Sequence, residues 1–160
     1  MTLCDLYPIL DNYTESIILK ELGEINLPIN IEKIIENYGI TLKKECIDNE
    51  EIAGAIKITD DSAIIVINTY NNAEVRQTFT MAHEFGHFIS YKVQGMIGEI
   101  IEFRDGTSSI GESSEEIFAN RFAASILIPK SKLKELEEVS PEKFNVSPQS
   151  FAIRMRWLLC

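Results

Sequence analysis

The hydrophobic residues near the start of the chain recur with the spacing of helices. In two segments, residues 14–23 and 30–39, apolar side chains stand three and four positions apart, which predicts two amphipathic helices. Thr14 and Asn30 are suited to cap their first turns, and a glycine closes each segment. The chain is therefore expected to begin with a pair of helices.

The spacing then changes to the alternation that is typical of strands. Residues 40–46 alternate between apolar and polar side chains, and two short apolar runs follow at 52–58 and 63–68, separated by the turn-forming sequence TDDS. Three consecutive strands in a small antiparallel sheet are the simplest arrangement of these segments. Gly54 lies inside the middle run and predicts a local kink.

Helical spacing returns in residues 71–92 and again in residues 114–128, where the run stops before Pro129. Asn71 and Glu74 have the spacing of a capping box for the first of these two helices. The stretch between the helices is rich in glycine, serine and acidic residues. It is expected to be mostly loop with one short strand.

The last part of the chain, residues 131–160, is expected to be a C-terminal helical segment whose final helix starts at Ser147 and Pro148. Helices, a small sheet and further helices follow one another without repeats or a linker, and this order predicts an α+β fold. A length of 160 residues fits one domain spanning residues 1–160.

Composition and charge limit the functions and cellular locations that are expected for this protein. Apolar residues make up 45% and charged residues 25%, as in ordinary globular proteins. A formal net charge of -10 argues against direct binding to nucleic acid or to an anionic membrane. Three cysteines without a CxxC pair indicate a reducing compartment. With no secretion signal and no apolar run long enough to span a bilayer, a cytoplasmic protein is expected.

The candidate chemistry lies in the sequence TMAHEFGHFIS, which holds the only two histidines of the chain. Four positions apart on a helix, His83 and His87 project side by side and can share one metal ion, and Glu84 can reach the outer shell of that ion. This is the HExxH arrangement, in which zinc polarises a water molecule and the glutamate takes its proton. A pair of surface histidines would produce the same pattern, so the metal site is distinguished from it only by the presence of a third ligand.

A catalytic zinc site needs a third protein ligand, and here it must be a downstream carboxylate because no histidine remains. On the helix predicted at 114–128, Glu116 falls on the buried line with Asn120, whereas Glu115 lies nearer the flank and suits the helix N-terminus. Because a buried carboxylate is costly without a cation, Glu116 is the favoured ligand. The full set of candidates is Glu99, Glu102, Asp105, Glu112, Glu115 and Glu116.

Two sequences together, RQTFTMAHEFGHFIS and EEIFANRFAASILIP, resemble the ImmA/IrrE family of metallopeptidases, gluzincin-like zinc proteins of bacteria and their mobile elements. The likeness covers most of the chain and is only general in residues 1–50. It implies Zn²⁺ bound by His83, His87 and Glu116, with Glu84 as the general base. It also implies that the substrate is a helix-turn-helix transcriptional repressor, whose loss relieves repression.

The resulting expectation is a zinc-dependent endopeptidase of narrow specificity. One alternative is a metal-containing protein that binds and sequesters a repressor or an antitoxin-like partner without cleaving it. Another alternative places the final helix, with Arg154 and Arg156, in a DNA-binding unit, although the net acidity counts against it.

Two features of substrate binding stay open at the level of sequence. The group that stabilises the oxyanion has four candidates: Tyr70, Tyr91, Arg76 and Arg121. The strand 52–58 is expected at a sheet edge, where it could pair with an extended substrate. A bulky residue at Gly54 is then expected to impair cleavage while leaving bound zinc unchanged.

Overall fold

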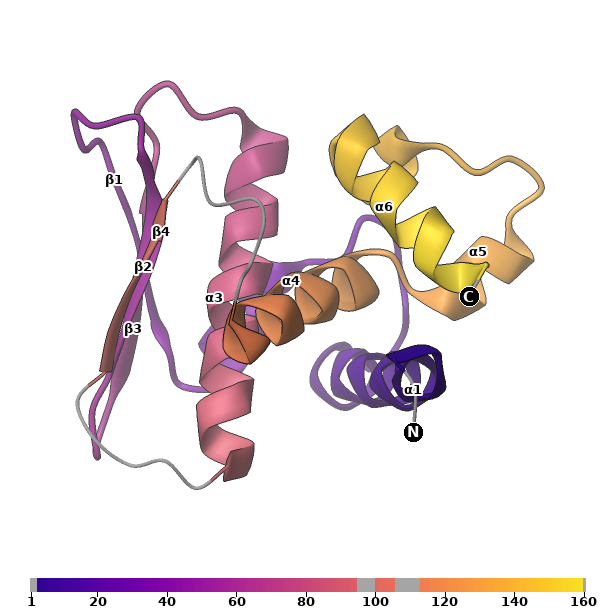
Figure 1. Ribbon diagram of the computed structural model, residues 1–160, viewed down its shortest axis with the longest axis horizontal. Helices are drawn as coiled ribbons and strands as arrows, with labels where there is room; N and C mark the ends of the chain where they lie inside the picture. Colours follow the sequence, from indigo (N-terminus) through magenta and orange to yellow (C-terminus); the bar gives the residue numbers. More distant parts are fainter. Residues whose placement is uncertain (1–2, 95–99, 106–112, 160) are drawn as a thin grey trace.

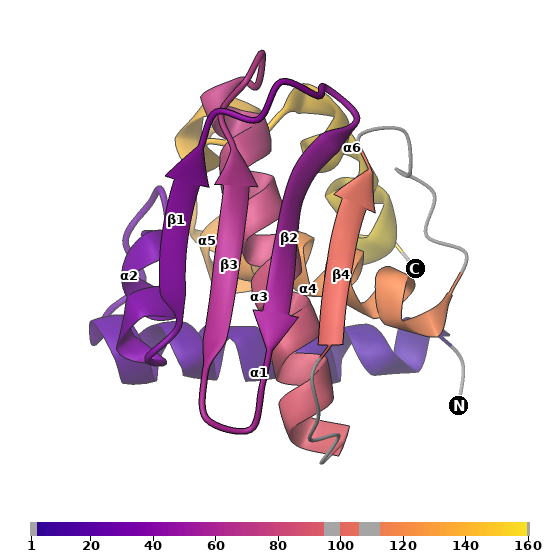
Figure 2. The same cartoon turned by 90° about the vertical axis from the view of Figure 1, so that its left-hand side faces the viewer.

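Helices and a mixed sheet form two layers in the computed structural model, which describes residues 3–94, 100–105 and 113–159 (Figure 1). The helices gather behind one face of the sheet, as seen when the sheet faces the viewer (Figure 2). The predicted α+β class is confirmed. None of the helices in the described ranges has both the length and the apolar character needed to cross a membrane.

The two N-terminal helices are present, but the first is longer than predicted. Helix α1 spans Leu3–Leu22 and α2 spans Ile31–Asn37. Asn30 caps α2 as expected, since its side chain accepts a hydrogen bond from the Lys33 amide at 3.1 Å. Thr14 does not cap α1; it lies buried inside the helix. The earlier start of α1 is not evident from the sequence because Pro8, a residue that interrupts helical hydrogen bonding, lies within the helix.

The sheet has the strand order β1-β3-β2-β4 in the described residues. Strands β2 (Ile52–Ile58) and β3 (Ala63–Asn68) form the predicted antiparallel pair. Strand β1 (Thr41–Glu45) pairs with β3 in parallel, so the sheet is mixed and not purely antiparallel. Strand β4 (Ile100–Asp105) is the short strand expected between the two long helices, and it pairs in antiparallel fashion with the edge of β2 opposite to β3.

Because β2 lies between β3 and β4, the prediction that it forms a sheet edge is wrong. Gly54 also has a packing role. A Cβ atom at this position would lie 2.7 Å from Thr80 Cγ2 and 2.9 Å from the Val66 carbonyl oxygen. The register of β2 with β4 shifts between Ile52 and Gly54. A bulky residue there would therefore disturb the packing of a helix on the sheet, and its effect on cleavage would not report substrate pairing.

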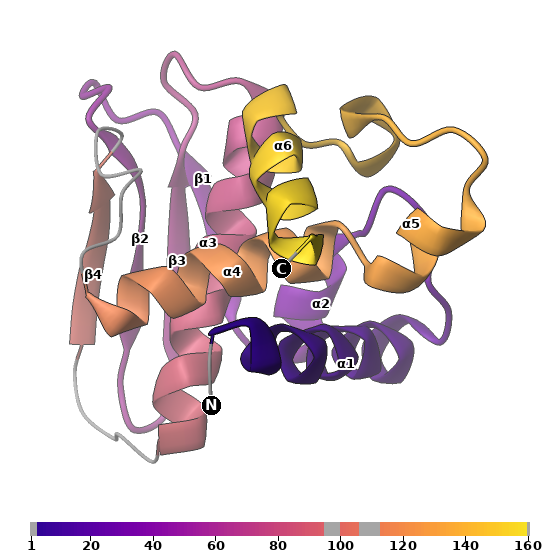
Figure 3. The same ribbon diagram turned by 45° about the vertical axis from the view of Figure 1, so that its right-hand side comes forward.

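The two central helices are α3 (Glu74–Gln94) and α4 (Ser114–Leu127). The predicted capping box at the start of α3 does not form, because Asn71 has a left-handed backbone (φ 47°) and its side chain donates to Glu50 instead. Helix α3 packs its apolar side on β2 and β3, where Phe85, Ile65 and Ile67 are fully buried. Helix α4 crosses α3 on the side away from the sheet (Figure 3).

The C-terminal segment consists of α5 (Lys130–Glu135), a 3₁₀ helix at Pro141–Phe144, and α6 (Pro148–Leu158). The start of α6 agrees with the prediction, since Ser147 accepts a hydrogen bond from the Ser150 amide and Pro148 occupies the first turn. The segment packs on α4 and α1 and not on the sheet (Figure 1).

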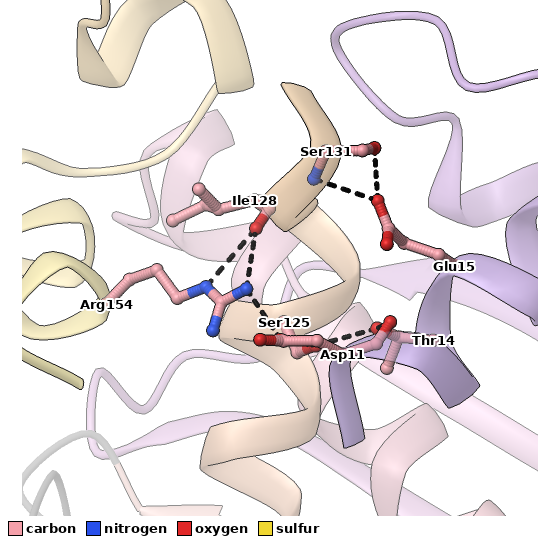
Figure 4. Close-up of polar contacts among 7 residues, drawn as sticks. All are labelled: Asp11, Thr14, Glu15, Ser125, Ile128, Ser131 and Arg154. Carbon is pink, nitrogen blue, oxygen red and sulfur yellow. Dashed lines mark hydrogen bonds and ion pairs between the residues drawn. The ribbon is translucent and has the colours of Figure 1, made fainter. Parts of the chain in front are cut away.

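A buried polar network joins α1, α4 and α6 (Figure 4). The Arg154 guanidinium pairs with the Asp11 carboxylate at 2.7 Å and donates two further hydrogen bonds to the Ile128 carbonyl. Asp11 also accepts from the Ser125 hydroxyl, which in turn pairs with Thr14. All four side chains are at most 2% exposed. The network fixes the C-terminal half of α4, the helix whose first turn reaches the candidate site.

Candidate metal centre

The three side chains predicted as metal ligands meet at the place where α3 and α4 cross. His83 and His87 come from consecutive turns of α3, and Glu116 comes from the first turn of α4. Both histidines are 1% exposed, whereas the side chain of Glu116 is 27% exposed. The cluster therefore lies inside the fold and reaches solvent through its carboxylate.

The helices approach closely because each has a small residue at the crossing. A Cβ atom added to Gly86 would lie 3.1 Å from the Cα atom of Ala119 and 3.2 Å from its carbonyl oxygen. Backbone atoms cannot rotate away as a flexible side chain can. Gly86, which lies between the two histidines in the motif, therefore permits the approach that brings Glu116 to both imidazoles.

The donor atoms of the cluster are already close together. The Glu116 oxygens lie 2.8 Å from His87 Nε2 and 3.3 Å from His83 Nε2, and the two Nε2 atoms are 3.0 Å apart. Ligands about 2.0–2.1 Å from a tetrahedral zinc ion are separated by about 3.3 Å. The three atoms thus have nearly the spacing that such an ion imposes, and two imidazoles with a carboxylate are a donor set that suits zinc. The residues fit a divalent metal.

The charge of Glu116 also suits this role. Hydrogen bonds from His83, and next from His87, hold the pKa of the Glu116 carboxyl well below its usual range, although partial burial acts in the opposite direction. Glu116 is therefore ionised at neutral pH. It offers a negatively charged oxygen to a cation held between the imidazoles.

Asn120, one turn after Glu116 on α4, orients the first histidine. The Asn120 side-chain oxygen lies 2.8 Å from His83 Nδ1. An amide oxygen only accepts hydrogen bonds, so Nδ1 carries a proton. When a metal ion displaces the proton that Nε2 shares with Glu116, the lone pair of Nε2 faces the cluster. The sequence placed Asn120 on the buried side of its helix but gave it no role. Its spacing of four from Glu116 is the signal that could have identified it.

Glu84 follows His83 on α3 and is also buried, with 1% exposure. An ionised carboxylate in such a place is costly unless it is compensated. A cation at the neighbouring cluster would lower this cost. Its role as general base stays a prediction.

Glu116 is the carboxylate that joins the histidines among the candidates whose side chains the structure describes. Glu115 lies on the wall of a different surface groove. Glu102 and Asp105 lie on β4, and their side chains are outside the part of the protein that the structure describes. The two other candidates, Glu99 and Glu112, lie outside the described residues.

The four candidates for oxyanion stabilisation differ in position. The Tyr91 ring stacks on the His87 ring, with centroids 6.4 Å apart, so it contacts the cluster. Arg121 instead lies over the rings of Tyr7 and Trp157. No hydrogen bond or ion pair joins Tyr70 or Arg76 to the ligands within the described ranges. Tyr91 is thus the candidate that the geometry favours.

The alternative in which the terminal helix binds DNA is weakened, because one of its two arginines is not available to a phosphate. Arg154 is 1% exposed and paired with Asp11, so it cannot reach a phosphate without breaking the buried network. Of the two arginines of α6, only Arg156 is exposed.

Comparison with known families supports the metal interpretation. A family model described as the IrrE N-terminal-like domain, Peptidase M78, matches residues 35–156, a range that includes α3, α4 and all three candidate ligands. The match extends over more than half of the chain. No curated protein matches it.

Proposed function

The chain belongs to the Peptidase M78 family of metallopeptidases, and on that premise we propose that it is a zinc-dependent endopeptidase of narrow specificity. The observation that carries the proposal is the convergence of His83, His87 and Glu116 from two helices, with the Glu84 carboxylate on the same helix as the histidines. We further propose that the substrate is a helix-turn-helix repressor, as the resemblance to ImmA/IrrE proteins implies.

The residues of the site have separate roles in hydrolysis. A zinc ion bound there supplies a Lewis acid that polarises the scissile carbonyl and lowers the pKa of a water molecule to about 7. Glu84 accepts one proton from the attacking water and delivers it to the leaving nitrogen as the C–N bond breaks. The second proton of the water stays on the new carboxyl group, so the products are a carboxylic acid, which ionises at neutral pH, and an amine. Asn120 holds the His83 ring in the orientation that directs Nε2 to the ligand cluster.

The Glu84→Gln substitution tests the catalytic role. It keeps the size of the side chain but removes the base, so the variant should bind zinc normally and lose about 10²–10⁴ in cleavage rate. Glu74→Gln is the matched control, because Glu74 is an exposed carboxylate on the same helix as Glu84 and lies outside the cluster. Zinc content by mass spectrometry and cleavage by intact mass would be measured together.

The same variant separates hydrolysis from sequestration. If Glu84→Gln binds zinc and still relieves repression as fully as the wild type, the protein acts by binding its partner and the peptidase proposal fails. The substrate proposal is tested separately, by incubating the zinc-loaded protein with a purified helix-turn-helix protein encoded by a neighbouring gene. Cleavage of an unrelated protein with the repressor left intact would contradict the substrate class but not the peptidase activity.

A further inference from the structure

A surface groove lies between the first half of α1, the last turns of α3 and the first turns of α4. The arrangement of these three helices can be followed in Figure 3. Its volume is about 590 Å³. Phe118 and Arg121, which line it, are turned about 140–200° around α4 from Glu116. The groove therefore lies on the side of α4 that faces away from Glu116.

Apolar side chains are unusually exposed around this groove. Of the six large hydrophobic residues that are exposed in the described ranges, four line it: Ile9 (59%), Tyr13 (39%), Val93 (72%) and Ile117 (38%). Single exposed apolar residues are ordinary, but a contiguous group on one surface marks an interaction site. The group draws on all three helices around the groove.

One cation lies in this apolar wall. The Arg121 guanidinium is held over the Tyr7 and Trp157 rings, at 4.4 and 4.9 Å from their centroids. Its Nη1 atom is buried, and no acceptor for it exists in the described part of the chain. Burial lowers the pKa of Arg121, but a guanidinium keeps its charge in proteins. Arg121 lines the groove and as a whole residue is only partly buried, so its positive charge favours a partner that brings a carboxylate to this wall.

We propose that this groove binds an amphipathic helix of a protein partner, which places aliphatic side chains against Ile117 and Val93 and one Asp or Glu carboxylate against Arg121. The exposed rim favours a protein segment, since small-molecule sites bury most of their ligand. None of the described residues that line the groove belongs to a strand, which disfavours pairing with an extended peptide. Glu115 also lines it and repels an anion, so the partner's carboxylate is directed to the Arg121 end.

The proposal is tested by selecting binders from a displayed library of 16-residue helices that carry a fixed stripe of leucines and randomised positions elsewhere. Peptides that bind the wild type should be enriched in Asp or Glu at one position relative to the stripe. Their affinity, measured by fluorescence anisotropy, should fall at least about tenfold on Ile117→Asp and on Val93→Asp. Leu19→Asp is the matched control: Leu19 is an α1 residue, 50% exposed, outside the groove, and this change should leave the affinity unaltered.

The contact with Arg121 is tested by a double-mutant cycle. Exchange of the peptide's acid for its amide should weaken binding to the wild type about tenfold or more, but should have little effect on Arg121→Met, whose fold is checked by its melting temperature. Equal binding of the acid and amide peptides to the wild type would overturn the proposal, as would equal losses on Leu19→Asp and Ile117→Asp. A library without enriched binders would also overturn it. Saturable binding of decanoate in the groove would also overturn the proposal, because it would indicate a small apolar acid as the ligand. Self-association of the protein that is lost in Ile117→Asp would overturn it as well, because it would indicate a second copy of the chain as the partner.

Discussion

Replacing Asn120 by alanine should weaken zinc binding although Asn120 is not a ligand. The substitution removes the acceptor of the 2.8 Å hydrogen bond from His83 Nδ1. His83 is 1% exposed, so water cannot easily take the place of the lost oxygen. The ring is then free to rotate or to move its proton to Nε2, and either change removes the lone pair from the cluster.

The size of the effect follows from the environment of the bond. Leaving a buried N–H without an acceptor costs about 1–3 kcal/mol, and loss of a partner that orients a metal-bound histidine lowers affinity about 10–100-fold. A factor of 10–100 corresponds to about 1.4–2.7 kcal/mol, so the two estimates agree. Asn120→Asp keeps an acceptor at the same place and should retain zinc to within about threefold of the wild type.

Zinc affinity would be measured by competition with a chromophoric chelator, and the tautomer of His83 by long-range ¹H–¹⁵N NMR of the metal-free protein. His83 Nδ1 is expected to be protonated in the wild type. Zinc affinity unchanged in Asn120→Ala, with the fold intact by circular dichroism, would refute the positioning role. A wild-type spectrum showing an unprotonated Nδ1 would refute it independently.

Other predictions concern the crossing, the buried network and acid. Gly86→Ala should lower the stability of the protein by about 1–3 kcal/mol and should also lower its zinc affinity, because the added Cβ atom meets the Ala119 backbone. Chemical denaturation would measure the stability and chelator competition the zinc affinity. An unchanged zinc affinity would contradict the role of Gly86 in the close crossing of the helices. Arg154→Met should destabilise the protein by about 3–5 kcal/mol in urea, since it leaves the buried Asp11 carboxylate without its cation; a loss below 1 kcal/mol would contradict this. In zinc-free protein, Glu116 has a lowered pKa; the stability it adds is fully present above the ordinary carboxyl pKa of about 4.3 and is lost as the pH falls further. The difference in unfolding free energy between wild type and Glu116→Gln should therefore shrink on acidification below pH 4, and a difference that grows would refute the sign.

The elements that were predicted well are those whose signal is local. Strands β2 and β3 have the predicted limits because a short apolar run between turn residues leaves little choice of conformation. Asn30 and Ser147 act as caps because a cap needs only an amide three residues later. The same local reasoning failed at Asn71, whose side chain is engaged by Glu50 from a distant turn.

The partner of β1 could not be read in the same way. Alternation along a strand reports which of its faces is buried, and it carries no information about which neighbour lies beside it. The parallel pairing of β1 with β3 depends on how the chain crosses over between them. The position of β2 in the interior of the sheet follows from that pairing and from the addition of β4.

For the site, the sequence by itself determined the pair of imidazoles and the glutamate beside them, because a helix of fixed pitch sets the positions of residues one and four apart. It also favoured Glu116, since a carboxylate on the buried line of a helix needs a cation. The hydrogen bond from His83 to Asn120 and the dependence of the cluster on Gly86 were decided only by the tertiary structure. Both arise from the distance and angle at which two helices cross, and these are set by the packing of the whole core and not by any single segment.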